Sequence, residues 1–239
     1  MFVIPMVGKS SRFFDAGYEV PKFQLECAKE SVFDRAVKSF NKYFSTDYFI
    51  FVVPSAFDAE SYVVNSARRL GIQNFHVIVL EDGTSGQGET VYSAFKNTAE
   101  FDDEPLFIFN IDTFLLNFTK PEFHKFCDGY LEVFSGEGDH WSFVKPAEGN
   151  SVLRTSEKVR ISELCSNGLY YFRSAGLYKS VYKSSVAKVI ETSKESYIAP
   201  MYNFLIENGG DVRYKLVDGK DIVFCGTPEE YMNAIHYFS

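Results

Sequence analysis

The sequence predicts an α/β fold in which a mainly parallel central sheet is flanked by helices and is followed by a mixed, β-rich second half. Three observations predict it: the chain has 239 residues, short apolar runs alternate with helical patterns up to about residue 112, and the alternation then loosens. A chain of this length can bury a sizeable core, as one large α/β domain or as two small domains, and we favour one domain. Strand and helix in alternation indicate βαβ units and a parallel sheet covered on both faces.

The first half carries these strand and helix patterns in turn. Each predicted strand is a short apolar run that stops at a turn-forming or polar residue, as buried strands do. The predicted strands are Phe2–Pro5, Tyr48–Val53, Phe75–Leu80 and Leu106–Asn110. Apolar residues at helical spacing lie between them and predict helices at about Val32–Phe44, Ala59–Leu70 and Glu89–Thr98. We therefore expect a Rossmann-like sheet in this half.

The second half is expected to form a mixed sheet with two helices. Its strand-like pieces are separated by turns such as SGEGD, and they lie at Tyr130–Phe134, Trp141–Lys145 and Leu169–Phe172. A helix is predicted at about Ile198–Asn208, because Gly209 and Gly210 follow it as a C-cap signal. A last helix is predicted from residues suited to its N-cap, N1 and N3 positions, which are Thr227, Pro228 and Glu230.

Charge and cysteine content narrow the function classes. The net charge of −8 argues against a nucleic-acid partner, because binding to a phosphate backbone needs clustered Lys and Arg. A small anionic ligand stays open, since a few amides and cations suffice for it. The four cysteines form no CxxC pair, so we expect neither a zinc site nor disulfides, and a reducing, cytoplasmic location. The opening residues, MFVIPMVGKSSRF, are apolar for too short a stretch to form a signal or membrane-spanning segment.

The loop after the first predicted strand has the composition of a polyanion site. Ligands of open α/β sheets bind beyond the carboxyl ends of the strands. This loop, VGKSSRFFDAGYEVPK, offers small residues that let backbone amides approach a phosphate, and positive charge on Lys9, Arg12 and Lys22. It is neither a GxGxxG nor a Walker A sequence, which argues against dinucleotide binding and P-loop hydrolysis. A surface turn with ordinary cations is the alternative.

The fourth predicted strand ends at a carboxylate. In FIFNIDT, Asp112 follows a buried apolar run, where a carboxylate without a cation or donor would be costly. Mg²⁺ would satisfy it, since this ion is usually held by one or two carboxylates together with substrate phosphates. The alternative is that Asp112 caps a turn with its own backbone.

Five motifs, in order along nearly the whole chain, resemble the sugar-phosphate nucleotidyltransferase family, the pyrophosphorylases that make nucleotide sugars. The first loop is similar to the family signature at Gly8, Ser10, Ser11, Arg12, Pro21 and Lys22. The metal-binding strand end of the family resembles NIDT, and its Glu-Lys motif resembles SEKVRIS. The Gly-bearing strand beside the acceptor resembles SNGLYYF, and the closing Gly-Thr-Pro-Glu segment resembles CGTPEEYMNA. The closest resemblance is to members from bacterial surface-polysaccharide (capsule) gene clusters.

The resemblance implies one nucleotidyltransferase domain, 1–239, with a nucleotide-binding half at 1–118 and an acceptor-binding half at 119–239. Its partners would be a nucleoside triphosphate and a small phosphorylated acceptor. Exposed aromatic residues in the second half are compatible with a homodimer, but the sequence does not determine the oligomeric state. Arg12 would hold the β- and γ-phosphates, Lys22 the reacting α-phosphate and Asp112 the Mg²⁺. Gly8, Ser10 and Ser11 would line the phosphates. Glu157, Lys158 and Gly168 would bind the acceptor, with Lys158 at its phosphate and with SEL, DHWSF and YIAPMYN around it.

The segment TSGQGETVYSA resembles the family segment beside the nucleobase, which assigns Gly86, Gln87, Gly88 and Glu89 to the nucleotide. Glu89 stands where family members often have Gln. A carboxylate only accepts hydrogen bonds, so it suits the exocyclic amine of cytosine and repels the carbonyl of uracil or thymine. We therefore expect a preference for CTP. Gln87 could equally read the base, and Glu89 could merely begin a helix.

Two departures from the family pattern leave alternatives open. Met6 and Val7 replace the usual Gly-Gly start, and Phe224 stands where many members have a second metal-binding Asp. Asp221 and Asp139 are the nearest substitutes by sequence. A catalytically degenerate nucleotide-binding relative therefore remains an alternative. So does a metal-dependent glycosyltransferase of related architecture, although NIDT lacks that class's usual pair of Asp residues separated by one residue.

Overall fold

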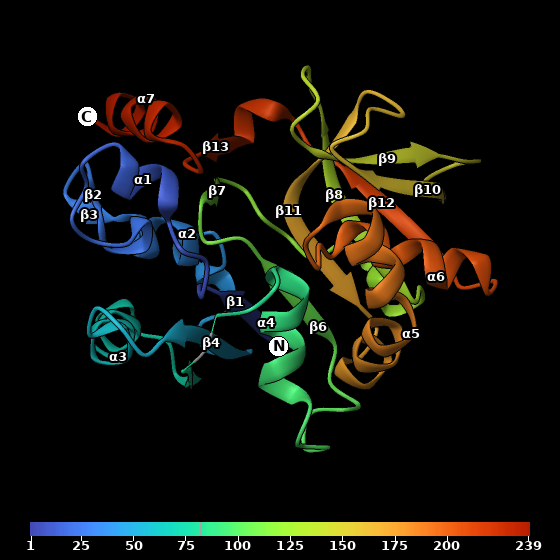
Figure 1. The fold of residues 1–239 in the computed structure, drawn as a ribbon, viewed down its shortest axis with the longest axis horizontal. Coiled ribbons are helices and arrows are strands. Elements are labelled where there is room, and N and C mark those ends of the chain that lie inside the picture. Colours follow the sequence, from blue (N-terminus) through green and yellow to red (C-terminus); the bar gives the residue numbers. More distant parts are fainter. Residues whose placement is uncertain (82) are drawn as a thin grey trace. The chain divides into compact units, whose positions relative to one another are not determined.

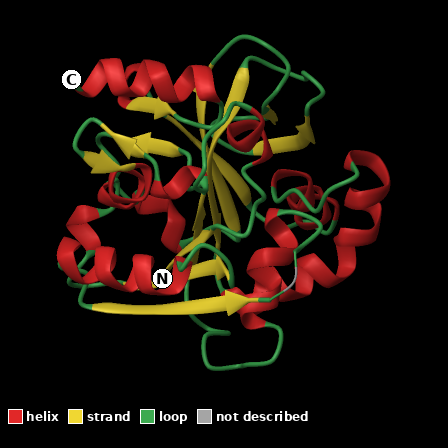
Figure 2. Ribbon diagram, turned by 60° about the vertical axis from the view of Figure 1, so that its left-hand side comes forward, coloured by secondary structure: helices red, strands yellow, loops and turns green. Residues whose placement is uncertain are grey.

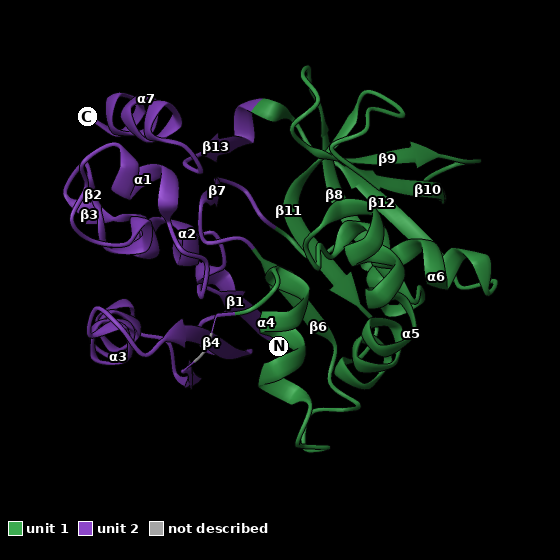
Figure 3. Cartoon of the chain, in the orientation of Figure 1, with its two compact units in different colours: residues 1, 84–109, 119–219 green, residues 2–83, 110–118, 220–239 purple. Residues whose placement is uncertain are grey.

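The computed structural model describes residues 1–81 and 83–239, which form two compact units (Figures 1 and 3). Unit 1 comprises residues 1, 84–109 and 119–219, and unit 2 comprises residues 2–83, 110–118 and 220–239. Each unit combines helices with strands (Figures 2 and 3), and the predicted α/β class is confirmed. The division into a nucleotide half and an acceptor half at residue 118 is a functional assignment and stays a prediction.

Unit 2 contains the parallel strands of the first half. Strand β4 (Tyr48–Pro54) pairs in parallel with β1 (Phe2–Pro5) and with β5 (Asn74–Leu80). The inner residues of β1 and β4 are fully buried, as expected for a parallel sheet covered on both faces. Its helices are α1 (Ser11–Asp15), α2 (Val32–Lys38), α3 (Ala59–Leu70) and α7 (Pro228–Phe238). The predicted strands are confirmed, and α3 has the predicted bounds.

Unit 2 also contains two small antiparallel pairs. Strand β7 (Thr113–Leu115) pairs with β13 (Ile222–Phe224), and β2 (Glu26–Cys27) pairs with β3 (Glu30–Ser31). The predicted helix at Val32–Phe44 is shorter: α2 ends at Lys38 and a 3₁₀ turn, η2 (Asn41–Tyr43), follows. Between them, the buried Ser39 hydroxyl accepts a hydrogen bond from the Leu115 amide (2.9 Å), a contact with a distant segment.

Unit 1 contains the mixed sheet predicted for the second half. Its strands are β6 (Leu106–Phe109), β8 (Gly129–Ser135), β9 (Ser142–Pro146), β10 (Val152–Glu157), β11 (Leu164–Phe172) and β12 (Val212–Leu216). The central strand β11 is buried throughout and runs antiparallel to β6, β8 and β9, whereas β12 runs parallel to β8. Strand β10 pairs with β9 at the edge.

The helices of unit 1 differ most from the prediction. Helix α4 (Gln87–Phe95) begins earlier than expected, and the helix expected at Ile198–Asn208 divides into the 3₁₀ turn η4 (Ala199–Met201) and α6 (Tyr202–Glu207). The longest helix, α5 (Ala175–Ser193), was not predicted at all. Within the described residues, no helix is both long and apolar enough to cross a membrane.

Candidate active site

The phosphate-type loop starts at the carboxyl end of β1 in unit 2. Ser10 takes the left-handed conformation (φ 50°) and α1 begins at the next residue. Gly8, Ser11 and Arg12 are exposed, whereas Phe13 is buried and fixes α1 to the unit. The loop is closed on itself, because the Ser10 hydroxyl accepts a hydrogen bond from the Lys22 amide (3.3 Å). The Arg12 side chain thus starts from an anchored turn and faces solvent.

Lys22 and Asp112, ninety residues apart, form an ion pair. The Lys22 Nζ atom lies 2.5 Å from Asp112 Oδ2, and the side chains are 21% and 22% exposed. Lys22 opens the 3₁₀ turn η1 (Lys22–Gln24) after the buried Pro21, which fixes where the side chain departs. Both predicted charges therefore lie together, half-buried and open to solvent. The charge compensation expected for Asp112 is supplied by this lysine.

The closing Gly-Thr-Pro-Glu segment packs against the same carboxylate. The Asp112 carbonyl accepts a hydrogen bond from the Cys225 amide (2.8 Å). A Cβ atom on Gly226 would lie 3.1 Å from Asp112 Oδ2, so a larger residue here would press on the carboxylate. Thr227 caps α7, and Glu230 Oε2 accepts from the amides of Gly226 (2.9 Å) and Thr227 (3.0 Å). The predicted N-cap, N1 and N3 roles are confirmed, and this capping box holds Gly226 beside Asp112.

Asp221, one candidate for the second carboxylate at the position that Phe224 occupies, does not lie beside Asp112. Phe224 pairs with Thr113, and the Asp221 carbonyl accepts from the Leu116 amide. Asp221 therefore lies about four residues along the β7–β13 ribbon from Asp112, or roughly 13 Å at the usual rise per strand residue. Its carboxylate accepts instead from Asn117 Nδ2 (3.0 Å). The other candidate from the sequence, Asp139, belongs to unit 1, whereas Asp112 belongs to unit 2.

Over residues 1–81 and 83–239, no three Asp, Glu, His or Cys side chains cluster closely enough to form a metal site of protein ligands alone. Asp112 is one carboxylate next to an exposed loop, and Glu230 Oε2 lies 3.4 Å from the same Gly226 Cβ position that Asp112 approaches. This donor set fits an ion that takes one or two carboxylates and completes its shell with phosphates and water, which is how proteins usually hold Mg²⁺.

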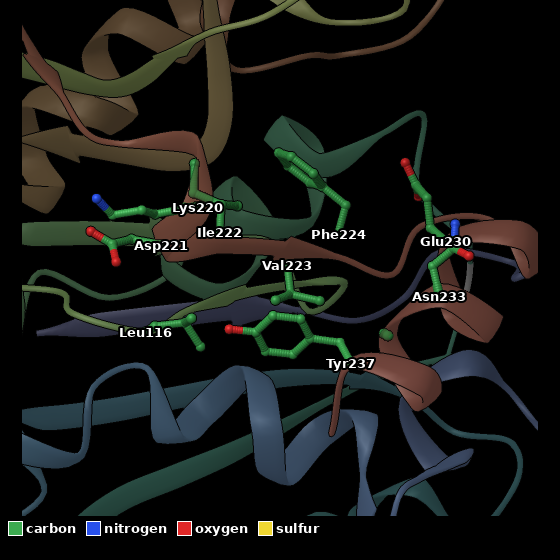
Figure 4. Close-up of a pocket in the computed structure, with 10 residues that line it drawn as sticks. Leu116, Lys220, Asp221, Ile222, Val223, Phe224, Glu230, Asn233 and Tyr237 are labelled. Carbon is green, nitrogen blue, oxygen red and sulfur yellow. The ribbon is translucent and has the colours of Figure 1, made fainter. Parts of the chain in front are cut away.

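A pocket of about 650 Å³ lies between β13 and α7 (Figure 4). Lys220 and Asp221 stand at one end and Glu230 and Asn233 at the other, with Val223, Phe224 and Tyr237 between them. None of its lining residues comes from the loop of residues 7–22, so it is not the predicted phosphate site.

In unit 1, Gly86 and Gly88 of the predicted nucleobase segment lie in close contact with another part of the backbone. A Cβ on Gly86 would lie 2.8 Å from the Ser196 nitrogen, and one on Gly88 would lie 2.6 Å from the Ser196 carbonyl oxygen. Ser196 is fully buried, and its carbonyl accepts from the Gly88 amide (2.7 Å). The close approach that these glycines allow is therefore to Ser196, a partner that the sequence did not indicate. Gln87 is the first residue of α4.

Glu89 lies in the first turn of α4. Its Oε2 atom accepts a hydrogen bond from the Ser85 amide (2.6 Å), and the bonds from the Ser85 side chain and backbone lower the pKa of Glu89. Glu89 is therefore an ionised acceptor at neutral pH and caps its own helix, which is the helix-start alternative. A role for Glu89 beside a nucleobase stays a prediction.

The predicted acceptor residues lie on β10 and β11 of unit 1. Glu157 ends β10, accepts a hydrogen bond from the Ser142 hydroxyl on β9, and has a pKa raised by burial. Lys158 follows with φ 54°, and its Nζ donates to the Tyr197 hydroxyl (2.6 Å), a bond that raises the pKa of Lys158. Gly168 has φ 90° where the β11–β8 register shifts, which is a bulge in a buried strand.

Comparisons with solved structures give a near relative and many similar folds. No family model matches the chain, and no curated protein matches it. The solved structure of the nucleoside-diphosphate-sugar pyrophosphorylase from Vibrio cholerae RC9 is 41% identical, with 99% of this chain and 100% of that chain covered and a TM-score of 0.92.

Two more distant structures share the fold alone. A putative glucose-1-phosphate thymidylyltransferase from Bacillus anthracis is 13% identical, covering 99% of this chain and 94% of that chain with a TM-score of 0.75. The inositol-1-phosphate CTP transferase from T. maritima is 15% identical, covering 98% and 95% with a TM-score of 0.70.

Proposed function

The chain belongs to the sugar-phosphate nucleotidyltransferases, the pyrophosphorylases that make nucleotide sugars, and we propose that it transfers CMP from CTP to a sugar phosphate or polyol phosphate. Pyrophosphate leaves, and the product is an activated precursor for surface polysaccharide. The observation that carries the proposal is the group of Lys22, Asp112 and Gly226. Three separate motifs of the predicted signature supply these residues, and they meet at one carboxylate.

The proposed reaction is an in-line attack by an acceptor phosphate oxygen on the α-phosphorus of the triphosphate. The new P–O bond forms as the bond to the pyrophosphate breaks. The attacking phosphate is already ionised at neutral pH, so no general base is required, and the protein mainly positions the reactants and neutralises charge. Arg12 holds the β- and γ-phosphates, Lys22 the α-phosphate and Lys158 the acceptor phosphate.

Mg²⁺ is the cofactor that this proposal requires, and Asp112 is the residue proposed to hold it. When bound, the ion would neutralise charge on the phosphates. Because Lys22 pairs with Asp112, the lysine stands where it can turn from the carboxylate to a phosphate oxygen. The ion pair thus keeps both groups in place before the substrate arrives.

The preference for cytosine rests on Glu89. Its carboxylate is ionised, and in the described part of the chain Ser85 supplies the hydrogen bonds that it accepts, so it retains acceptor capacity. A well-made contact of this kind is worth about 1 to 3 kcal/mol, or roughly tenfold to a hundredfold in kcat/KM. We expect CTP to exceed UTP and dTTP by this factor. Equal values would remove Glu89 from base reading.

The decisive experiment measures pyrophosphate release with the four common nucleoside triphosphates and a panel of sugar and polyol phosphates, in the presence of Mg²⁺. The proposal expects one acceptor to give stoichiometric pyrophosphate and a nucleotide-diphosphate product. Triphosphate binding without pyrophosphate release from any pair would instead establish the degenerate relative, which Phe224 favours. Transfer of sugar from a nucleotide sugar would establish the glycosyltransferase.

A further inference from the structure

Among the described residues, the Tyr197 side chain is the hydrogen-bond partner of the Lys158 ammonium. The Lys158 backbone takes the left-handed conformation (φ 54°), which a non-glycine residue adopts at a cost, and its amide donates to the Trp141 carbonyl (2.9 Å). The side chain is exposed, yet its Nζ donates to the Tyr197 hydroxyl and lies 4.7 Å from the centre of that ring. An ammonium has three N–H donors, so two remain for an incoming phosphate.

The hydroxyl of Tyr197 acts as the acceptor in its hydrogen bond with Lys158. Lysine offers no acceptor, so the tyrosine oxygen accepts from Lys158 and its own proton points elsewhere. Burial raises the pKa of Tyr197 and the negative charge of Glu195 adds to this, so the hydroxyl stays protonated at neutral pH. Tyr197 can therefore hold the ammonium in one place without neutralising its charge.

Ser196, which lies between Glu195 and Tyr197 in the sequence, fixes this segment to the rest of unit 1. Ser196 is fully buried, and its amide donates to the Ser85 carbonyl (2.9 Å) while its carbonyl accepts from Gly88 (2.7 Å). Its hydroxyl accepts from the Glu89 amide (3.0 Å). One short segment, residues 195–197, thus binds the predicted nucleobase segment through Ser196 and the acceptor lysine through Tyr197.

We propose that Tyr197 is a positioning residue that sets the Lys158 ammonium for the acceptor phosphate, and that Ser196 fixes this arrangement to the loop of residues 85–89. This inference rests on the proposed function, because that function assigns the phosphate to Lys158. Fixing a long side chain before binding removes part of the entropy that the bound complex would otherwise lose. Because residues 195–197 contact both, the Lys158 ammonium can be held in one place only when the loop of residues 85–89 is itself ordered.

The first test is Tyr197→Phe, which keeps the ring and removes the hydroxyl. Tyr214→Phe is the matched control, because the Tyr214 hydroxyl also makes one hydrogen bond in unit 1, to the Gly149 carbonyl (3.2 Å). Without substrates, Lys158 in Tyr197→Phe is expected to react faster with an amine-modifying reagent, followed by peptide mass spectrometry, because its pKa is no longer raised by the hydroxyl. Tyr214→Phe should react like the wild type. Equal Lys158 labelling in all three proteins overturns the positioning role.

Kinetics give a second readout. Tyr197→Phe should raise KM for the acceptor roughly five- to tenfold, the usual effect of losing one hydrogen bond, and leave KM for the nucleotide unchanged. Equal increases in both KM values would indicate general disruption and contradict the role.

Ser196→Ala tests the link to the loop. It keeps the backbone bonds and removes the acceptor of the Glu89 amide. We expect faster hydrogen exchange at that amide, faster labelling of Lys158 and a higher KM for both substrates. Unchanged Lys158 labelling refutes the link. Labelling and exchange are measured on the protein alone, so they decide the inference even if no acceptor yields pyrophosphate and the proposed function fails.

Discussion

Replacing Asp112 with Asn should separate catalysis from stability. The change keeps the size of a side chain that has little room, since Oδ2 lies 3.1 Å from the position of a Cβ on Gly226. It removes the negative charge that pairs with Lys22 at 2.5 Å. Because both side chains are about one fifth exposed, water screens the pair. Such pairs contribute only about 0.2 to 1 kcal/mol, or at most about 2 to 4 °C in Tm for a chain of this size.

The catalytic effect should be far larger. Loss of a metal ligand removes several kcal/mol of transition-state stabilisation, and each 1.36 kcal/mol is tenfold in rate, so kcat should fall about 10²- to 10³-fold. Differential scanning fluorimetry measures the stability change, and pyrophosphate release with Mg²⁺ measures the rate. A loss of activity that merely followed the unfolded fraction would mean that Asp112 serves the fold.

Asp221→Asn is the matched control for this variant. Asp221 lies on the same β7–β13 ribbon, at the end away from Asp112, and accepts a hydrogen bond from Asn117. It should retain wild-type turnover. If Asp221→Asn lost as much activity as Asp112→Asn, or if Asp112→Asn kept more than about a tenth of the wild-type rate, the assignment of the metal to Asp112 would be refuted.

Three further outcomes follow from the same geometry. Arg12→Ala and Lys22→Ala should each cripple pyrophosphate release while Tm falls by no more than about 4 °C, since both side chains are proposed to face ligand; a larger loss of Tm favours a structural ion pair. Gly88→Ala should destabilise the protein by about 1 to 3 kcal/mol in urea unfolding, because the new Cβ would lie 2.6 Å from the Ser196 carbonyl oxygen. The pKa of Glu89 is lower in the folded protein than in the unfolded chain, so the bonds between Glu89 and Ser85 stabilise the fold. This stabilisation is complete above the unfolded-chain pKa of about 4.3 and is lost as the pH falls through the pKa of the folded protein. Glu89→Gln should therefore be less stable than the wild type at pH 7, with the difference closing in unfolding measurements at pH 3.

The parallel half of the fold was predictable because its inner strands, β1 and β4, are uniformly apolar apart from Tyr48 at one end. The runs at β1 and β4 are buried on both faces, so no polar residue interrupts the signal. Helix α5 was missed because a polar residue interrupts the apolar pattern on its buried face. Ser185 lies on that face beside Tyr178 and Val181, and its hydroxyl bonds to the Val181 carbonyl (2.7 Å), so a polar residue stands where the helical pattern needs an apolar one.

The candidate site was predictable where a motif lies on a strand end or a tight turn. Lys22 and Asp112 follow structural boundaries that the sequence marks, with Pro21 before one and a buried strand before the other. The partner of Gly86 and Gly88 was not predictable, because Ser196 reaches them across more than a hundred residues and carries no motif of its own. Tyr197 was expected only as part of the acceptor pocket. Its bond to Lys158 depends on where Ser196 is fixed.

The discontinuous make-up of unit 2 affects how the protein is made on the ribosome. Residues 2–83 and 110–118 leave the ribosome early, but the Gly226 segment that packs on Asp112 and the helix that it caps come from residues 220–239. At about 5 to 20 residues per second, Asp112 waits roughly 6 to 23 seconds for its neighbours. Meanwhile unit 1, which is nearly continuous from 84 to 219, is synthesised in full. A nascent chain therefore cannot complete the surroundings of Asp112 before residues 220–239 have been synthesised.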